Sequence, residues 1–179
     1  MFASDEEEIL DVVNAEDKVI GQIARGDMMS LTKKPNQYLR AVEIFLQRPD
    51  GAIYLPRRSK EKSIAPGGYD LSAAGHINSG ESYSEACVRE VKEELGIDTS
   101  IDVFKFVRKI NPTPDLFYFR MIYLLQSDQE PILSPEHTEY SWVQPDILEE
   151  IVRNDAPTKD TLYEDIPILV DFLSRESIA

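Results

Sequence analysis

The stretch from Gly75 to Ile97, GHINSGESYSEACVREVKEELGI, is the most informative part of this chain. Its segment Tyr83 to Leu95 contains no Gly or Pro, and Glu81 and Ser82 are suitable acceptors near its start. Gly96 follows, and glycine is favoured just past a helix end because it adopts a left-handed backbone without steric cost. The pattern therefore predicts a helix over 83–95 that ends at Gly96.

Three carboxylates share one face of this predicted helix. Glu90, Glu93 and Glu94 are spaced i, i+3 and i+4, so their side chains are neighbours. Like charges in this arrangement destabilise a helix by roughly 0.2–0.5 kcal/mol per pair. A hard divalent cation would remove that penalty, and oxygen ligands suit Mg²⁺ first and Mn²⁺ second. From the three glutamates alone, a solvated acidic helix remains the competing interpretation.

The whole run resembles the Nudix box, G-x5-E-x7-R-E-U-x-E-E-x-G-U with U aliphatic, and every specified position matches. The resemblance implies an α/β fold, the Nudix α/β/α sandwich with a mixed β-sheet. It also implies a Mg²⁺-dependent hydrolase, with Mn²⁺ as a second cation, that cleaves a nucleoside diphosphate linked to another group. The acids carried over by position are Glu90, Glu93 and Glu94 as metal ligands, with Glu93 and Glu94 as catalytic candidates. Which carboxylate is the general base is left open by the spacing.

Other residues of the motif take structural or backbone roles by the same resemblance. The carbonyl of Ala74, just before Gly75, would be a further metal contact. Glu81 would pair with Arg89 and hold the loop–helix–loop in shape. The motif residues with structural roles are Gly75, Glu81, Arg89 and Gly96.

Composition limits the classes of function. The net charge of −14 over 179 residues leaves no broad basic face for a nucleic-acid polymer. No uninterrupted apolar run approaches membrane-spanning length, and Leu116 to Leu125 is interrupted by Arg120, so no membrane span is expected. A single cysteine, Cys87, excludes an internal disulfide, and the acidic start is unlike a signal peptide. The expected compartment is the cytoplasm.

The remaining sequence predicts a hairpin followed by one mixed domain. Strand patterns, turn signals and helix signals together divide the chain into an N-terminal hairpin with a polar connector, 1–35, and a main domain, 36–179. The predicted strands are 19–24, 38–47, 52–56, 70–74, 101–110, 116–125 and 140–143, the first pairing with a strand near 11–14. The predicted later helices are 145–153 and 162–174. The hairpin edge could pair with a second copy, which would give a homodimer.

A basic cluster precedes the box. Arg57, Arg58, Lys60 and Lys62 fall within six residues of an otherwise acidic chain. The competing interpretation is a solvated loop, whereas arginine also holds phosphate oxygens through two parallel hydrogen bonds. The segments 57–67 and 72–76 are similar to those of Nudix isopentenyl-diphosphate isomerases. That resemblance assigns diphosphate binding to Arg58 and Lys62, and we add Arg57 as a candidate.

The departures from the isomerases argue against isomerase chemistry. Ala74 stands where that family has its catalytic cysteine, and the only histidines are His76 and His137. No glutamate stands in 116–125, where the isomerases place theirs. We therefore expect a pyrophosphohydrolase acting on a small-molecule diphosphate. The alternatives are an isomerase-like enzyme and a non-catalytic nucleotide-sensing module. Glu136 and Glu139 are further candidate metal ligands.

Overall fold

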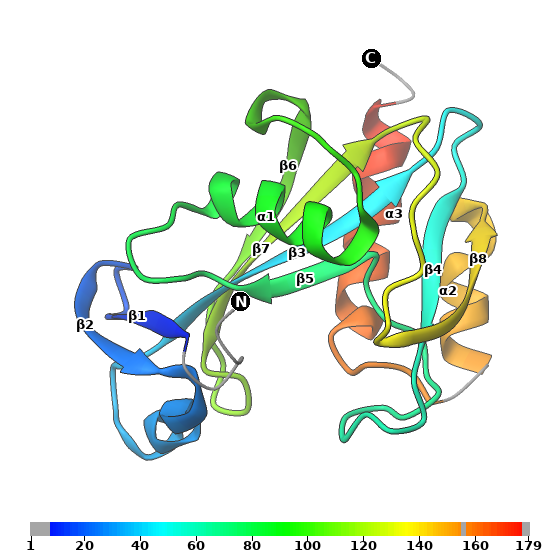
Figure 1. The fold of residues 1–179 in the computed structure, drawn as a ribbon. Coiled ribbons are helices and arrows are strands. Elements are labelled where there is room, and N and C mark those ends of the chain that lie inside the picture. Colours follow the sequence, from blue (N-terminus) through cyan, green and yellow to red (C-terminus); the bar gives the residue numbers. More distant parts are fainter. Residues whose placement is uncertain (1–7, 155–156, 177–179) are drawn as a thin grey trace.

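The computed structural model describes residues 8–154 and 157–176, which form a mixed sheet between helices and a small separate hairpin (Figure 1). The strands are β1 (Ile9–Val13), β2 (Val19–Ala24), β3 (Leu39–Gln47), β4 (Ile53–Arg58), β5 (Ala73–His76), β6 (Phe104–Ile110), β7 (Tyr118–Gln126) and β8 (His137–Val143). The helices are α1 (Tyr83–Leu95), α2 (Pro145–Asn154) and α3 (Leu162–Glu176), with 3₁₀ segments at Arg25–Lys33 and Ile101–Val103.

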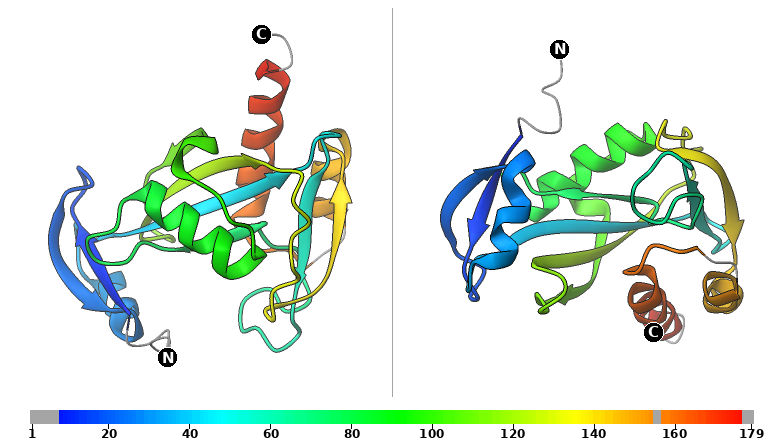
Figure 2. Two further views of the ribbon diagram at one scale, coloured as in Figure 1. Left: turned by 45° about the horizontal axis from the view of Figure 1, so that its top comes forward. Right: turned by 90° about the horizontal axis from the view of Figure 1, so that it is seen from below.

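The main sheet has six strands in the order β6-β7-β3-β4-β8, with β5 also paired to β3. β3 and β7 are parallel, and the other pairs are antiparallel. Helix α1 covers one face of the sheet, and α2 and α3 cover the other (Figures 1 and 2). The α/β/α sandwich with a mixed sheet, expected from the sequence, is confirmed.

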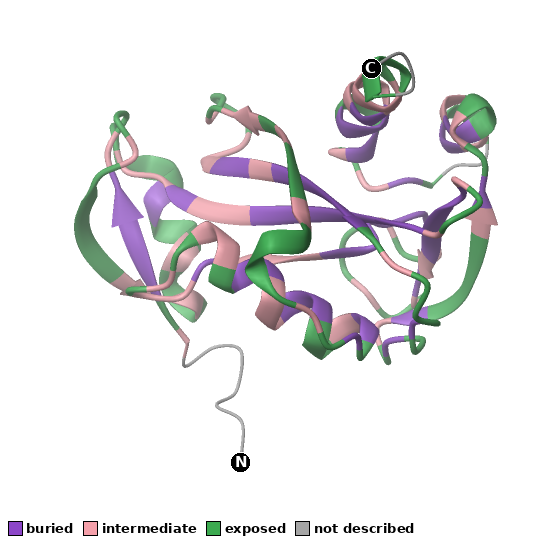
Figure 3. Ribbon diagram, turned by 90° about the horizontal axis from the view of Figure 1, so that it is seen from above, coloured by how far each residue is buried: buried purple, intermediate pink, exposed green. Residues whose placement is uncertain are grey.

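Side-chain alternation along β3 explains the two hydrophobic cores. Val42, Ile44 and Leu46 pack beneath α1, whereas Phe45 packs with the residues of α2 and α3. Both cores are buried along the central strands, and the outer faces of the helices are exposed (Figure 3). β3 is therefore the strand that connects the two layers.

Helix α1 has the bounds predicted from the sequence. Ser82 and Glu85 form a capping box at its start, and Gly96 ends it with φ of +66°. Cys87, Val91 and Leu95 are buried against the sheet. The apolar side of the helix is thereby fixed, which turns its glutamates toward β5 and solvent.

The strand predicted over 70–74 is shifted in the structure, because β5 begins only at Ala73. Asp70 is taken up by buried ion pairs instead. The Ser72 hydroxyl accepts from the Leu46 backbone N–H and donates to the Tyr54 carbonyl. The Ser72 side chain thereby connects β3 and β4, which share few backbone hydrogen bonds at this point. Pairing of β5 with β3 begins at the next residue, Ala73.

The N-terminal hairpin predicted from the sequence is present as β1 and β2. Leu10 and Val12 form a small core with Leu31 and Leu39. The polar connector after the hairpin contains a 3₁₀ helix, Arg25–Lys33, and Leu31 of this segment is buried in the small core. Two strand predictions also change: 101–103 is a 3₁₀ turn, and β8 begins at 137 rather than 140. The division into 1–35 and 36–179 stays a prediction.

Within 8–154 and 157–176, the helices are too short or too polar to cross a bilayer.

Candidate active site

Arg89 organises the loop–helix–loop from the first half of α1. Its Nε and Nη2 donate to the two Glu81 carboxylate oxygens, both at 2.9 Å. Nη2 also donates to the His76 carbonyl at 2.9 Å, and Nη1 donates to Glu90 Oε1 at 2.6 Å. The ion pair expected between Glu81 and Arg89 is thus formed. It ties the start of the helix to the end of β5.

Glu90 lies against the backbone of β5 at Gly75. A Cβ added to Gly75 would lie 1.6 Å from Glu90 Oε1, so only glycine leaves room for this carboxylate. The Glu90 side chain is about 10% exposed and is bound to Arg89. Burial raises the pKa of Glu90 to about 7, against the opposing attraction of Arg89. The glycine of the motif therefore has a steric function here.

Glu94 lies one turn further along α1. Its Oε2 accepts the Ala74 backbone N–H at 3.0 Å. Burial, followed by repulsion from the Glu90 charge, raises the pKa of Glu94 to about 8. Because the Ala74 N–H is bonded to Glu94, it points away from β3. Because the N–H and C=O of one strand residue point to the same side, its carbonyl is directed toward the same edge.

Glu93 differs from the other two acids of the helix. Its side chain is about 50% exposed and contacts Arg89 Nη1 at 3.3 Å. The structure therefore divides the three predicted ligands into two inward carboxylates and one at the solvent boundary. Among the described residues, no three His, Cys, Asp or Glu side chains already converge as a ligand cluster. Arg89 and the Ala74 N–H instead hold Glu90 and Glu94 individually.

The donor set fits a divalent cation. The buried Glu90 and the partly buried Glu94 repel one another, and both have raised pKa values, so a positive charge placed between them would stabilise their ionised forms. The oxygen character of Glu90, Glu94 and the neighbouring backbone carbonyls matches Mg²⁺ or Mn²⁺. The residues that could hold the ion are Glu90, Glu93, Glu94 and the carbonyl of Ala74.

The basic cluster predicted to bind substrate is largely engaged within the protein. The Arg57 side chain lies 4.1 Å from the Tyr69 ring centroid and contacts Glu139 at 3.3 Å. Arg58 is buried and donates to Asp70 and to the Ile64 carbonyl. Arg58 therefore shapes the 59–68 loop, and substrate binding by these residues stays a prediction.

The Lys62 side chain is more exposed than those of Arg57 and Arg58, the other two candidates for substrate binding. Its Nζ lies 2.6 Å from Glu136, with both side chains partly exposed. The charge of Glu136 also contributes to the raised pKa of Glu94, after burial and the charge of Glu90. Glu139 instead lies opposite Arg57 in the β4–β8 pair. Of these two acids, Glu136 is therefore the one whose charge acts on Glu94, whereas Glu139 lies in β8.

A buried polar network beside the site was missed by sequence reasoning. Asp70 contacts Lys159 at 3.1 Å, His137 at 3.6 Å and Arg58. Although burial alone would raise it, the neighbouring His137 and the cations Lys159 and Arg58 hold the pKa of Asp70 below its ordinary range. No local pattern identifies this network, because its members come from β4, the loop before β5, β8 and the α2–α3 connection.

His76 and Arg25 also lie near the acids. Burial lowers the pKa of His76 to about 4, so its ring is neutral at pH 7. The ring packs edge-on against Tyr118, with centroids 5.5 Å apart. Arg25, at the end of β2, contributes positive charge that lowers the pKa of both His76 and Glu90. No pattern in the sequence indicates that the hairpin reaches the motif.

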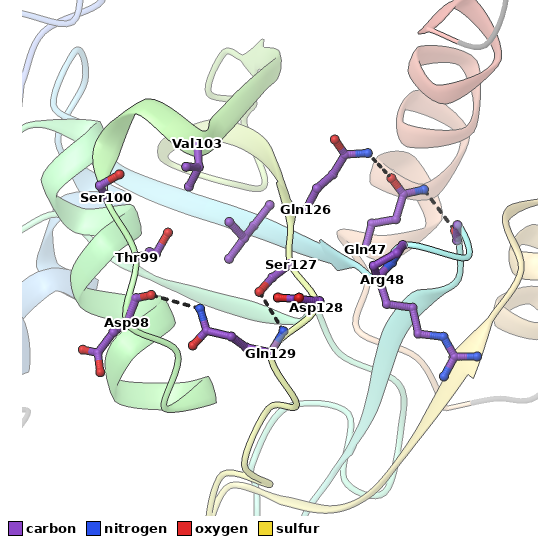
Figure 4. Close-up of a pocket in the computed structure, with 13 residues that line it drawn as sticks. Gln47, Arg48, Asp98, Thr99, Ser100, Val103, Gln126, Ser127, Asp128 and Gln129 are labelled. Atoms are coloured by element: carbon purple, nitrogen blue, oxygen red, sulfur yellow. Dashed lines mark hydrogen bonds between the residues drawn. The ribbon is translucent and has the colours of Figure 1, made fainter.

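A separate groove of about 1000 Å³ lies beyond the C-terminal end of α1 (Figure 4). Its lining includes Gln47 and Gln126 at the ends of β3 and β7, and Asp98 and Gln129 from neighbouring loops. The two glutamines are joined by a hydrogen bond of 2.8 Å. None of the helix glutamates lines this groove, so it is distinct from the carboxylate site.

Comparisons with known proteins agree with this geometry. A model of the NUDIX domain family matches residues 37–166. A Nudix hydrolase from Deinococcus radiodurans is 34% identical over 157 residues, which cover 86% of this chain and 90% of that protein. An isopentenyl-diphosphate Delta-isomerase from Photorhabdus laumondii is 29% identical, with 88% of each chain covered.

A solved structure supports the same assignment. A crystal structure from Deinococcus radiodurans aligns with a TM-score of 0.73 at 34% identity, covering 89% of this chain and 98% of the other. The family model, which covers residues 37–166, includes all the residues of the carboxylate site. The chain therefore belongs to the Nudix hydrolases, and it is a pyrophosphohydrolase of that family.

Proposed function

We propose that this protein is a Mg²⁺-dependent Nudix hydrolase that cleaves the diphosphate linkage of a nucleoside diphosphate derivative or a related small diphosphate. The observation that carries the proposal is the pair of carboxylates held beside β5, the buried Glu90 and the partly buried Glu94, both with raised pKa values. Mg²⁺ is the first choice of cation and Mn²⁺ the second, because clustered oxygen donors favour hard ions.

In this proposal the helix acids have different tasks. Glu90 and Glu94, with the Ala74 carbonyl, would hold the cation, and Arg89 keeps Glu90 in position. The bound cation would neutralise diphosphate charge and lower the pKa of a water molecule. Glu93 is the proposed proton acceptor, because its half-exposed carboxylate reaches solvent and is only weakly tied to Arg89. A general base of this kind contributes about 10²–10⁴-fold to the rate.

Substrate binding is proposed for the loop opposite the helix. Lys62 can exchange its partly exposed contact with Glu136 for a phosphate oxygen at small cost, since surface ion pairs contribute only about 0–1 kcal/mol. Arg57 is proposed as a second contact. Arg58 is proposed to act mainly through the loop that it anchors to Asp70. The cytoplasmic location and a homodimer stay predictions.

The test is a panel of small diphosphates incubated with the purified chain, with and without Mg²⁺. The panel holds nucleoside diphosphates and triphosphates, nucleotide sugars, dinucleotides and isopentenyl diphosphate. Mg²⁺-dependent appearance of phosphate or nucleoside monophosphate supports the proposal. Isomerisation of isopentenyl diphosphate without hydrolysis would support the isomerase alternative. Tight binding of a nucleotide with no product from any compound would support a sensing module.

A further inference from the structure

The N-terminal hairpin holds the loop that leads into α1. Asp11, in β1, accepts the Ser79 hydroxyl at 2.8 Å through Oδ1 and the Gly80 backbone N–H at 3.0 Å through Oδ2. Ser79 also donates its backbone N–H to the Ile9 carbonyl at 2.7 Å. Asp11 is only 7% exposed. A buried carboxylate is therefore devoted to two consecutive residues of the motif loop.

The same loop is bound from its other side by the residues that position Glu90. Glu81 Oε2 accepts the Asn78 backbone N–H at 3.0 Å. Glu81 in turn binds Arg89, and Arg89 binds Glu90. Contacts therefore run without a break from Asp11 through 78–80 to Glu81, Arg89 and Glu90. A change in the position of the loop is transmitted to the carboxylate that lies against Gly75.

The hairpin has a second attachment that does not involve this loop. Asp17, in its turn at φ of +59°, accepts from the Arg40 guanidinium, from the Tyr83 hydroxyl at 3.0 Å and from Lys109. Removing the Asp17 carboxylate should loosen the hairpin, and it leaves in place the groups through which Asp11 contacts Ser79 and Gly80. The two aspartates therefore separate the stability of the hairpin from its effect on the loop.

We propose that Asp11 is a positioning residue of the active site, which fixes residues 78–80 so that Glu81 and Arg89 hold Glu90 ready for a divalent cation. Asp11 precedes residue 37, where the match to the family begins, so it adds an element from outside the matched domain. The inference rests on the proposed function in one respect, because it takes Glu90 to be a cation ligand.

The experiment compares Asp11→Ala, Asp11→Asn, Ser79→Ala and Asp17→Ala in the full chain. Mn²⁺ binding is measured by calorimetry without substrate, and amide hydrogen exchange is followed over 77–82. Hydrolysis and thermal unfolding are measured in parallel. Asp11→Ala is expected to weaken Mn²⁺ binding by about tenfold, the lower scale for losing a residue that orients a metal ligand. The exchange of the Gly80 amide is expected to accelerate.

The other variants make this expectation specific. Asp11→Asn keeps an acceptor for Gly80 and can donate to the Ser79 oxygen, so it should bind Mn²⁺ within about twofold of the wild type. Ser79→Ala removes the hydroxyl that donates to Asp11 and accepts from Gln22, while Asp11 keeps its contact with Gly80, and it should weaken Mn²⁺ binding by about threefold, between the two Asp11 variants. Asp17→Ala should lower the unfolding temperature while leaving Mn²⁺ affinity unchanged.

Two results would overturn the inference. One is unchanged Mn²⁺ affinity in Asp11→Ala, or in Ser79→Ala if Asp11→Ala does not fold. The other is an equal loss of Mn²⁺ affinity in Asp17→Ala. Failure of the proposed function gives a different result, because the wild type would then hydrolyse no diphosphate. Weakened Mn²⁺ binding in Asp11→Ala would support the positioning role even in that case.

Discussion

Replacing Gly75 by alanine tests the most sharply defined contact of the site. The added Cβ would lie 1.6 Å from Glu90 Oε1 and 2.1 Å from its Cδ. Non-bonded heavy atoms are comfortable at about 3.5–4.0 Å, so the carboxylate must move by roughly 2 Å. The movement takes Glu90 away from its 2.6 Å contact with Arg89 and from the edge of β5. The backbone of β5 is fixed by pairing with β3, so the side chain is the part that moves.

The expected loss of activity follows from this displacement. A misplacement of about 1 Å in a reacting assembly can reduce the rate by about 10²-fold. Gly75→Ala should therefore lower kcat/KM for the best diphosphate substrate by at least about 10²-fold and weaken Mn²⁺ binding. The cost to folding should be about 1–3 kcal/mol, the usual range for overpacking. Gly21→Ala is the matched control, because its added Cβ meets nothing within 4 Å.

The assays are steady-state hydrolysis at saturating Mg²⁺, calorimetric Mn²⁺ binding and thermal unfolding of both variants. Wild-type kcat/KM and Mn²⁺ affinity in Gly75→Ala would refute the reasoning, because the displaced carboxylate would then have no part in the chemistry. A folded Gly75→Ala protein with low activity and weak Mn²⁺ binding is the expected result. Gly21→Ala should match the wild type in all three measurements.

Further predictions concern the acids, pH and the basic loop. Glu94→Gln keeps an acceptor for the Ala74 N–H but loses the charge. Hydrolysis should therefore fall by about 10²-fold or more, with little change in unfolding temperature. Near-wild-type turnover would exclude Glu94 as a metal ligand. An acid whose pKa is raised on folding binds its proton more tightly when folded, so the metal-free protein should lose stability as pH rises from about 4.5 to about 8. Unfolding scans in a chelator should show this decline, and Glu94→Gln should reduce it; an identical slope in the variant would contradict the assignment. Lys62→Ala should raise KM without changing the unfolding temperature. Arg58→Ala should instead lower the free energy of unfolding by about 3 kcal/mol, because it removes an ion-pair partner of the buried Asp70. Equal stability of these two variants, measured by denaturant unfolding, would show that the Arg58 pair is not structural.

The sequence alone predicted the parts of this protein that depend on local geometry. Helix α1 could be bounded to the residue because Ser82, Gly96 and the spacing of apolar residues act within a few turns. The pairing of Glu81 with Arg89 followed from the motif and is formed by neighbouring segments. The mixed sheet and the hairpin followed from the alternation of strands, turns and helices. Capping, turn and periodicity preferences act between residues that are close in the chain, so a single sequence is enough to predict them.

Tertiary structure alone decided which of these residues meet partners from distant segments. The pairing of Arg58 with Asp70 is not indicated by the basic cluster, because it depends on burial of a carboxylate beside a cation from another segment, and substrate binding by Arg58 stays a prediction. Asp11 reaches Gly80 across 69 positions of the chain, and no pattern near either residue marks the contact. Such contacts depend on how strands and loops are packed in space, and burial then determines which charges must be paired.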